Sequence, residues 1–326
     1  MDYTAPRWLP GGNLQTIWAA LYARRAEASV PALHRERWHT PDGDFIDVDF
    51  AHAPAGTGKP LLVLFHGLEG SSSSHYAQAF AAYAVAHGMD FAVPHFRGCS
   101  GEINLAPRAY HSGDFEEVGW MLARLHEHHA RTGGGPTLAV GVSLGGNALL
   151  RWAEEAGASA AQHAKAIASI CAPLDLAAGG RAIGKGFNKL VYTPMFLSTM
   201  KPKALAKLAQ HPGLFDREAL LAAKNLYEFD NIFTAPLHGF RDTDDYWSRG
   251  SAKPHLRAIH IPALVINAAN DPFIPAASLP TAADVGPQVT LWQPTHGGHV
   301  GFPAGRLPGH VSAMPQVVGS WLRQHT

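Results

Sequence analysis

Cysteine is scarce in this sequence, which limits the redox and metal chemistry that the chain can carry. Its 326 residues include two cysteines, Cys99 and Cys171, and neither belongs to a CxxC pair or to a zinc-like spacing. Two cysteines cannot build a disulfide framework of the kind that stabilises small secreted proteins. The composition therefore favours a protein of a reducing compartment.

An excess of one charge is also missing. Lysine plus arginine and aspartate plus glutamate both amount to 26, and no basic stripe is interleaved with aromatic residues. A nucleic-acid-binding protein needs a positive surface to neutralise phosphates. We therefore expect no nucleic acid as a partner. The sequence also lacks repeats and biased tracts, and 46% hydrophobic with 16% charged residues is typical of a globular protein.

Long hydrophobic runs are absent. No stretch approaches the roughly 18 apolar residues of a spanning helix, and the N-terminal residues lack the charged-then-apolar pattern of a signal peptide. Both observations predict a cytoplasmic protein without a transmembrane segment. Residues 14–22 nevertheless carry an apolar stripe at helical spacing. We expect this stripe to pack on the protein itself, and peripheral contact of residues 14–22 with a membrane is the alternative. The stripe comprises Leu14, Ile17, Trp18, Leu21 and Tyr22.

What the chain does have is a regular alternation of strand and helix patterns. Residues 35–52 alternate around a Pro-Asp-Gly turn and predict a β-hairpin. Residues 59–67, KPLLVLFHG, form a continuous apolar run typical of a strand buried on both faces. Further strand patterns then alternate with helix patterns at lengths that fit βαβ units. The sequence therefore predicts an α/β fold with a mostly parallel central sheet flanked by helices.

The alternation stops between residues 174 and 254, where the pattern is mainly helical and dotted with proline and glycine. Ordinary connections are about 2 to 6 residues long, so an insertion of this size carries its own structure. We expect one domain over residues 1–326, with residues 174–254 forming a helical cap inserted within it.

The strongest motif is Gly141-Val142-Ser143-Leu144-Gly145, a G-x-S-x-G pentapeptide between a buried-strand pattern and a helix pattern. That context is the one required by a nucleophile elbow, in which a serine sits on a sharp turn at the end of a strand. Glycines on both sides allow neighbouring backbone to approach the turn closely. We therefore predict Ser143 as a catalytic nucleophile.

A serine hydroxyl needs a base to take its proton, and the base needs an acid to orient it. Asp271 follows the strand pattern ALVINAAN, and two histidines, His296 and His299, follow in a glycine-rich loop. The order Ser, Asp, His is that of the α/β-hydrolase fold. Asp175 is an alternative acid, but it opens the insertion and fits a turn-capping role. Spacing alone leaves both histidines open as the base.

An oxyanion formed on the substrate also needs donors. In this architecture they are the backbone N–H of the residue after the nucleophile and one from the loop after the third strand. The first is Leu144, and Leu68, just after His66-Gly67, is our candidate for the second.

Several segments together resemble one known family. The segments FHGLEGSSSSHY, HFRGCSGEINLAPRAYHSGD, GVSLGGNALL, YEFDNIFTAPLHGF, NDPF and HGGHVGF are similar to the YheT-like branch of the α/β-hydrolase superfamily, related to ABHD-type lipases and esterases. The resemblance runs from about Trp8 to Trp321 and implies a triad of Ser143, Asp271 and His299, which favours His299 over His296. Many members carry an acidic residue where this chain has Asn270.

The resemblance implies ester hydrolysis, and the serine at the elbow favours an acyl-enzyme on Ser143. We expect a short- to medium-chain ester or lipid as substrate and no cofactor or metal, because a serine elbow needs no metal. Transfer of the acyl group to an alcohol is one alternative, and a non-catalytic binding protein on the same fold is another. Within the insertion, an apolar stretch has two competing uses: packing of the cap on the main domain, which we favour, and lining of an acyl pocket. Its candidate pocket residues are Phe187, Val191, Met195 and Phe196.

Two further groups are expected to be structural. Arg97 and Glu102, in the loop HFRGCSGEIN, are expected to hold loops together rather than to touch substrate. The run HEHH at His126–His129 is not the H-E-x-x-H motif of zinc sites and lies in a predicted surface helix. We interpret it as a solvated helix face.

Overall fold

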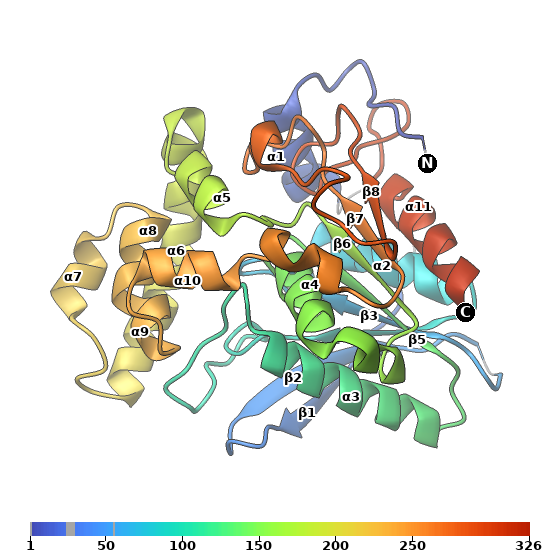
Figure 1. The fold of residues 1–326 in the computed structure, drawn as a ribbon, viewed down its shortest axis with the longest axis horizontal. Coiled ribbons are helices and arrows are strands. Elements are labelled where there is room, and N and C mark those ends of the chain that lie inside the picture. The colour runs from blue at the N-terminus through green and yellow to red at the C-terminus, as the bar shows by residue number, and fades with distance from the viewer. Residues whose placement is uncertain (1, 24–29, 55) are drawn as a thin grey trace.

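A computed structural model describes residues 2–23, 30–54 and 56–326 of the chain. Its centre is an eight-stranded sheet with the strand order β1-β2-β4-β3-β5-β6-β7-β8 (Figure 1). The strands are β1 (His34–His39), β2 (Phe45–Ala51), β3 (Leu61–Phe65), β4 (Asp90–Pro94), β5 (Thr137–Val142), β6 (Ala166–Ile170), β7 (Ala263–Ile266) and β8 (Val289–Trp292).

Six strands, β3 to β8, run parallel to one another, as the alternation of strand and helix patterns predicts. β1 and β2 form the predicted antiparallel hairpin, with His39 opposite Phe45 at its closed end. β2 joins the parallel strands through an antiparallel pairing with β4. The α/β class with a mostly parallel sheet is therefore confirmed.

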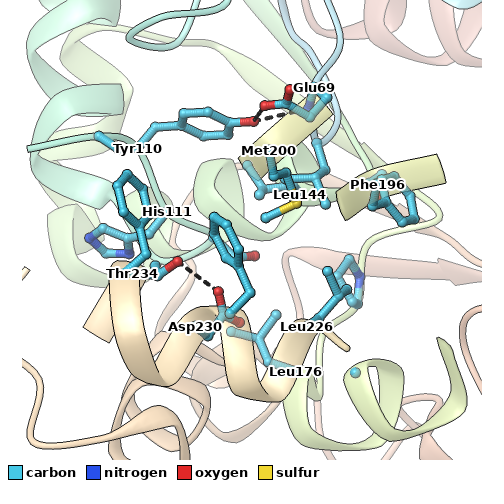
Figure 2. A pocket seen from close by; sticks show the side chains of 18 of the residues that line it. Glu69, Tyr110, His111, Leu144, Leu176, Phe196, Met200, Leu226, Asp230 and Thr234 are labelled. Atoms are coloured by element: carbon cyan, nitrogen blue, oxygen red, sulfur yellow. Dashed lines mark hydrogen bonds between the residues drawn. The ribbon is translucent and has the colours of Figure 1, made fainter. Parts of the chain in front are cut away.

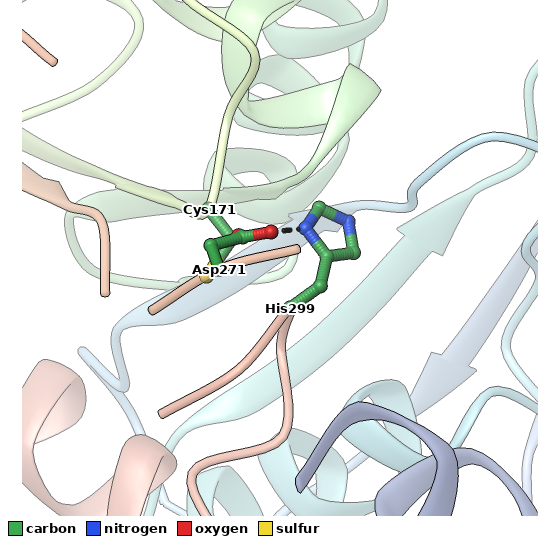
Figure 3. Close-up of side chains that lie close together, drawn as sticks. All are labelled: Cys171, Asp271 and His299. Carbon is green, nitrogen blue, oxygen red and sulfur yellow. Dashed lines mark hydrogen bonds and ion pairs between the residues drawn. The ribbon is translucent and has the colours of Figure 1, made fainter. Parts of the chain in front are cut away.

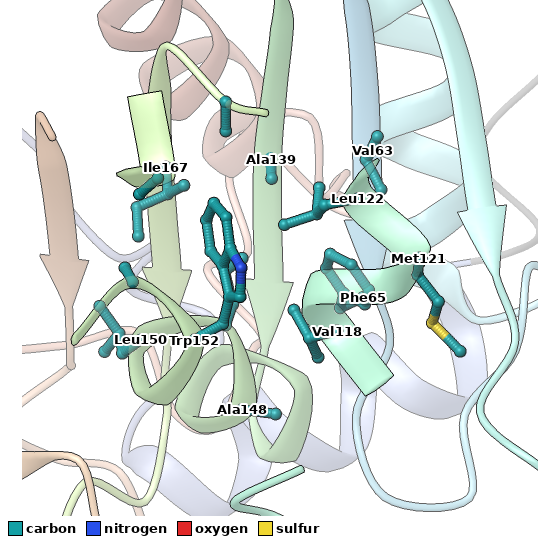
Figure 4. Close-up of a cluster of buried hydrophobic side chains, with 14 of the residues drawn as sticks. Val63, Phe65, Val118, Met121, Leu122, Ala139, Ala148, Leu150, Trp152 and Ile167 are labelled. Carbon is teal, nitrogen blue, oxygen red and sulfur yellow. The ribbon is translucent and has the colours of Figure 1, made fainter. Parts of the chain in front are cut away.

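Helices cover both faces of the sheet, which explains why the central strands are apolar along their whole length. In β3, Leu61, Val63 and Phe65 belong to one buried cluster, whereas Leu62 and Leu64 belong to the other. Figure 4 shows the first cluster, where Val63 and Phe65 meet the side chains of two helices. These helices are α3 (Phe115–Arg131) and α4 (Leu144–Ala156). The opposite cluster is closed by α2 (His75–Ala86) and α11 (Ala313–Leu322).

Between β6 and β7, the described chain forms helices and no strand. Helices α6 to α9 enclose a small core of their own, which includes Leu197, Leu220, Phe229 and Phe233. In Figure 1 this group, which we call the cap helices, lies to the left of the sheet. The helices of the insertion are α5 (Leu176–Ile183), α6 (Gly186–Gln210), α7 (Arg217–Ala222), α8 (Leu226–Phe229), the π-helical turn η3 (Asp230–Thr234), α9 (Ala235–Leu237) and α10 (Thr243–Gly250).

The N-terminal helix α1 (Gly12–Tyr22) buries only part of its apolar stripe against the protein. Leu14, Leu21 and Tyr22 are 51%, 60% and 52% exposed, whereas the buried residues of the helix are Gln15, Thr16 and Ala19. Packing of the stripe on the protein is confirmed for Ile17 and Trp18, which lie against buried clusters, and is wrong for Leu14, Leu21 and Tyr22. The physical reason is that the two polar side chains make hydrogen bonds inside the protein. No helix among the described residues is long and apolar enough to cross a membrane.

Candidate active site

Ser143 lies at the sharp turn between β5 and α4, as the elbow motif predicts. Its backbone has φ 53° and ψ −119°, a strained conformation for a residue with a side chain. The flanking glycines are required by contact: a Cβ on Gly141 would come 2.4 Å from Gly145 O, and one on Gly145 would come 2.5 Å from Phe65 O. The turn thus presents the Ser143 hydroxyl at the carboxyl end of the sheet.

The structure brings Ser143, Asp271 and His299 together. His299 Nε2 lies 2.9 Å from Ser143 Oγ, and His299 Nδ1 lies 2.8 Å from Asp271 Oδ2. Figure 3 shows the Asp271 carboxylate pointing at the imidazole. Because a carboxylate can only accept, Nδ1 carries the ring proton and Nε2 is left to accept from the serine hydroxyl.

Asp271 is held in place by the backbone that follows it. The carboxylate is buried, and its Oδ1 accepts a hydrogen bond from the Phe273 N–H at 2.8 Å. The competing residues lie elsewhere. Asp175 caps the N-terminus of α5 by accepting from the Ala178 N–H, and His296 is exposed. The geometry thus pairs Ser143 with His299 and Asp271 rather than with either competitor.

The two backbone N–H groups that the sequence predicts as oxyanion donors are those of Leu144 and Leu68. Leu144 is the first residue of α4, a position whose N–H has no partner within the helix. In the loop after β3, the N–H groups of Gly67 and Glu69 donate to tyrosine hydroxyls, and Gly70 donates to Gly67 O. Among the described residues, the N–H of Leu68 has no such partner, and Gly67 lies against Ser143. The arrangement is consistent with the predicted pair of donors.

A cavity of about 150 Å³ opens beside Ser143 and His299. Figure 2 shows its lining, with Leu144 on one side and Leu226, Asp230 and Thr234 of the cap helices on another. Apolar side chains supply most of the wall. Those from the insertion include Leu176, Ile183, Phe196, Met200, Phe229 and Phe233.

Of the four predicted pocket residues, one lines the cavity and three do not. Phe196 lines the cavity, but Phe187, Val191 and Met195 do not, and they are 50%, 38% and 50% exposed. All four lie on α6, whose two faces have different surroundings, so neighbours in the sequence point in different directions. The prediction is therefore wrong for Phe187, Val191 and Met195.

Residues 60–305 match the sequence profile of a family described as the alpha/beta hydrolase fold. The match covers most of the chain, including the three residues of the candidate triad. The chain belongs to the α/β-hydrolase family.

Relatives of this hydrolase place it in the YheT-like branch. The chain is 38% identical over 324 residues to the "Putative esterase YheT" of Escherichia coli, covering 98% of this chain and 93% of that protein. It is 30% identical over 289 residues to the phospholipase ABHD3 of Mus musculus, covering 85% and 68%. Among solved structures, the Pyrococcus furiosus esterase Pf2001 superposes with a TM-score of 0.58 at 14% identity, covering 99% and 96%, which supports the fold alone.

The hydrolase cavity also contains charged side chains that sequence reasoning missed. Glu69 and Lys203 form an ion pair of 2.9 Å at the wall, and Tyr110 donates to Glu69. Lys207 is buried and donates to two backbone oxygens and to Gln210, and burial lowers its pKa to about 8. Lysines on a helix are usually exposed, so nothing in the sequence marks Lys203 and Lys207 as residues that line a cavity. Only the fold shows it.

Asp230 is a second missed residue of the cavity. Its carboxylate accepts hydrogen bonds from Thr234 Oγ1 at 2.6 Å and from Trp247 Nε1 at 2.9 Å, and burial raises its pKa to about 6. It thereby ties the π-helical turn η3 to α10. The sequence signal was the segment YEFDNIFTAPLHGF, which marked the family but not the place of the aspartate.

His66 precedes the loop that carries Leu68, and it is fully buried. Its Nδ1 lies 2.8 Å from Gly67 O, and its Nε2 accepts from the Phe96 N–H at 3.1 Å. This pairing requires a neutral ring. Burial, together with the nearby His95, lowers the pKa of His66 to about 3. His66 therefore joins the loop after β3 to the end of β4.

Arg97, Glu102 and the HEHH run, which we expect to be structural, contact other parts of the protein. Arg97 is buried and forms ion pairs with Asp42, Asp44 and Glu117, while Glu102 pairs with Arg37. Arg97 also borders the cavity. In the HEHH run, His128 packs on aromatic rings of β1 and β2, and His129 lies 2.7 Å from Lys59 O. The helix face is thus packed rather than solvated at these two histidines.

One group of side chains in the described part of the chain has the spacing of metal ligands, and it overlaps the triad. The ligand atoms of Cys171, Asp271 and His299 lie within 4.8 Å of one another. Metals bind the thiolate form of cysteine. Burial and the Asp271 charge raise the pKa of the Cys171 thiol well above its usual range, so the thiolate is disfavoured. The Cys171 sulfur instead contacts the backbone of the His299 loop.

Proposed function

We propose that this α/β hydrolase cleaves carboxylic esters through an acyl-enzyme on Ser143. The observation that carries the proposal is the unbroken chain of contacts from Ser143 Oγ to His299 at 2.9 Å and from His299 to Asp271 at 2.8 Å. A nucleophile, a base within reach of its proton, and an acid that orients the base are the parts needed for acyl transfer.

In the first half of the reaction, Ser143 Oγ attacks the ester carbonyl carbon while His299 Nε2 takes the hydroxyl proton. The negative charge that develops on the carbonyl oxygen is stabilised by the N–H groups of Leu68 and Leu144. The bond to the alcohol oxygen then breaks, and His299 gives its proton to the departing alcohol. Ser143 is left acylated.

In the second half, a water molecule attacks the acyl carbon and His299 takes one of its protons. The bond to Ser143 Oγ breaks, the acid leaves, and the proton returns to the serine. Asp271 stays ionised throughout and stabilises the charged imidazole that forms in each half.

The cavity and the relatives both support this substrate class. Apolar side chains such as Phe196, Met200 and Phe233 suit the acyl chain of an ester or lipid. We propose a short- to medium-chain acyl group, whose length the ester series below measures. Relatives carry the names esterase, phospholipase and monoacylglycerol lipase, all of which describe ester hydrolysis.

The test is a series of p-nitrophenyl esters of increasing acyl length, with the wild type, Ser143→Ala and the exposed control Ser159→Ala side by side. We expect the control to match the wild type and Ser143→Ala to lose about 10⁴-fold or more in kcat. Activity that survives in Ser143→Ala would refute the mechanism. Ethanol added to the same assay measures acyl transfer, and ester formation faster than hydrolysis would replace water as the proposed acceptor.

A further inference from the structure

Four consecutive backbone N–H groups in the loop that carries His299 are each held by a different side chain. Gly297 N–H donates to Gln15 Oε1 at 2.9 Å, and Gly298 N–H donates to Asn270 Oδ1 at 3.0 Å. His299 N–H itself donates to Thr16 Oγ1 at 2.8 Å. Val300 N–H, the next in line, points at the sulfur of Cys171 at 3.4 Å. Side chains from α1 and from the ends of β6 and β7 thus meet on one short loop.

Of these four side chains, that of Gln15 makes the most hydrogen bonds. It is fully buried, its Nε2 donates to Leu9 O at 3.0 Å, and its Oε1 also accepts from Asn270 Nδ2 at 3.0 Å. The Asn270 amide therefore donates to Gln15 and accepts from the loop, next to the triad residue Asp271. One buried amide of α1 joins the loop of the base to the loop of the acid.

Thr16 accepts its hydrogen bond from the backbone N–H of His299 itself. Its hydroxyl donates to Gly12 O at 2.8 Å, so the lone pairs of the oxygen are turned toward the His299 N–H. Loop and helix also approach closely at Gly298, where a Cβ would come 2.7 Å from Gly12 O and 2.9 Å from Thr16 Oγ1. A side chain at position 298 would push the loop off the helix.

The loop needs such support because its backbone is strained. Val300 and Phe302 have φ values of 59° and 40°, which residues with side chains rarely adopt. Strained backbone of this kind costs about 1–3 kcal/mol per residue and persists only where its surroundings hold it. Without the four side-chain acceptors, the backbone around His299 would relax.

We propose that Gln15 and Thr16 of α1 are positioning residues for His299, which set the distance from its imidazole to Ser143. The proposal rests on the proposed function, in which His299 moves protons between Ser143, the alcohol and water. Displacing a reacting group by about 1 Å can cost about 100-fold in rate. The two side chains act through the loop and do not touch the substrate.

The orientation of α1 supports this role over simple packing. A helix that only packed would use apolar residues for its most buried positions. In α1, Ile17 and Trp18 pack on the protein only partly buried, Leu14 and Leu21 are half or more exposed, and the buried positions include Gln15 and Thr16. Burying polar groups is unfavourable unless they are hydrogen-bonded. Deviations of this kind from the local pattern are expected where function requires them.

The experiment compares Thr16→Val, which has nearly the same shape but no hydroxyl, with Thr16→Ser, which keeps the hydroxyl. Leu21→Ala, on the exposed side of the same helix, is the control. We expect Thr16→Val to lower kcat about 10- to 100-fold with KM changed less than twofold, and Thr16→Ser to restore kcat to within about threefold of the wild type. We expect Gln15→Met to behave like Thr16→Val, because it leaves the Gly297 N–H and the Asn270 amide without an acceptor.

A second readout does not depend on turnover. The proton between His299 Nδ1 and Asp271 should give a far-downfield proton resonance, identified by its loss in His299→Gln. We expect this resonance to shift or broaden in Thr16→Val and to stay unchanged in Leu21→Ala. A folded Thr16→Val variant with wild-type resonance, or with kcat within twofold of the wild type, would overturn the proposal. If the wild type cleaves no ester, the proposed function fails, and the resonance still decides the role of Thr16.

Discussion

Asp271 Oδ2 and His299 Nδ1 lie 2.8 Å apart, and the second oxygen of the same carboxylate accepts from the Phe273 N–H. The contact gives the imidazole one tautomer, with its proton on Nδ1 and its free lone pair toward Ser143. Without the carboxylate, the opposite tautomer would place a proton where the base must accept one.

Asp271→Asn tests this orientation. An amide nitrogen at that position donates to Nδ1 and so favours the proton on Nε2, facing Ser143. We expect kcat to fall about 10⁴-fold, as for the equivalent change in a serine protease, with little change in the free energy of unfolding. Steady-state kinetics with a p-nitrophenyl ester gives the first quantity and urea unfolding the second. A folded variant with more than a tenth of wild-type kcat would contradict the role of Asp271.

Acid pH is expected to destabilise the fold through His66. The pKa of the buried ring is about 3, below its ordinary value of 6.5. Between these values the unfolded state binds the proton and the folded state does not, so the stabilising contribution is complete above pH 6.5 and is lost as the pH falls toward 3. One such group lowers the free energy of unfolding by up to about 1.4 kcal/mol per pH unit.

His66→Gln separates this effect from other titrating groups, since an amide can also donate to Gly67 O and accept from Phe96 but does not titrate. Urea unfolding at pH 7, 6 and 5 should show a steeper loss of stability in the wild type than in the variant. Equal slopes would mean that His66 is not held neutral by burial.

Neighbouring residues on α6 are expected to differ in their effect on specificity. Phe196 lines the cavity, whereas Met195 is 50% exposed. Phe196→Ala should enlarge the cavity and move the preferred acyl chain to a longer one, and Met195→Ala should leave the profile unchanged. The measurement is kcat/KM across the p-nitrophenyl ester series. The same shift in both variants, or none in Phe196→Ala, would show that this wall does not bind the acyl chain.

Arg97 is expected to contribute mainly to stability. It is 5% exposed, and its guanidinium lies 2.8 Å from the buried carboxylates of Asp44 and Glu117. Arg97→Met removes the cationic partner of Asp44 and leaves Glu117 with Arg108 alone, and breaking a buried pair typically costs about 3–5 kcal/mol. Arg131→Met removes an exposed pair with Glu127 and should cost at most about 1 kcal/mol. Urea unfolding of both variants gives the comparison, and equal small losses would contradict the structural role.

The sequence was most informative where geometry leaves few choices. Only glycine fits at positions 141 and 145, because backbone lies within 2.5 Å of any Cβ there. The elbow was therefore readable from a pentapeptide. Asp271 and His299 follow strands of a parallel sheet, whose carboxyl ends meet at one edge, so their order along the chain predicted that they would lie near Ser143.

The sequence was least informative where polar residues are buried. The inward face of α6 includes Phe196, Met200, Lys203 and Lys207, and the two lysines hide its helical spacing. In α1, the apolar stripe is the most conspicuous pattern of the sequence, although Leu14, Leu21 and Tyr22 are exposed. Nothing in that pattern indicates that Gln15 is buried. In both helices the partners come from distant segments, so the inward face is fixed by tertiary contacts that no local pattern records.

The central claim is that Ser143 is the nucleophile activated by His299. Incubation with a fluorophosphonate, followed by intact-mass measurement and peptide mapping, tests it most directly, because the reagent captures an activated serine covalently. We predict one adduct per chain, located on Ser143, absent from Ser143→Ala and formed much more slowly in His299→Gln. An adduct on another residue, or no adduct on the folded wild-type protein, would contradict the account.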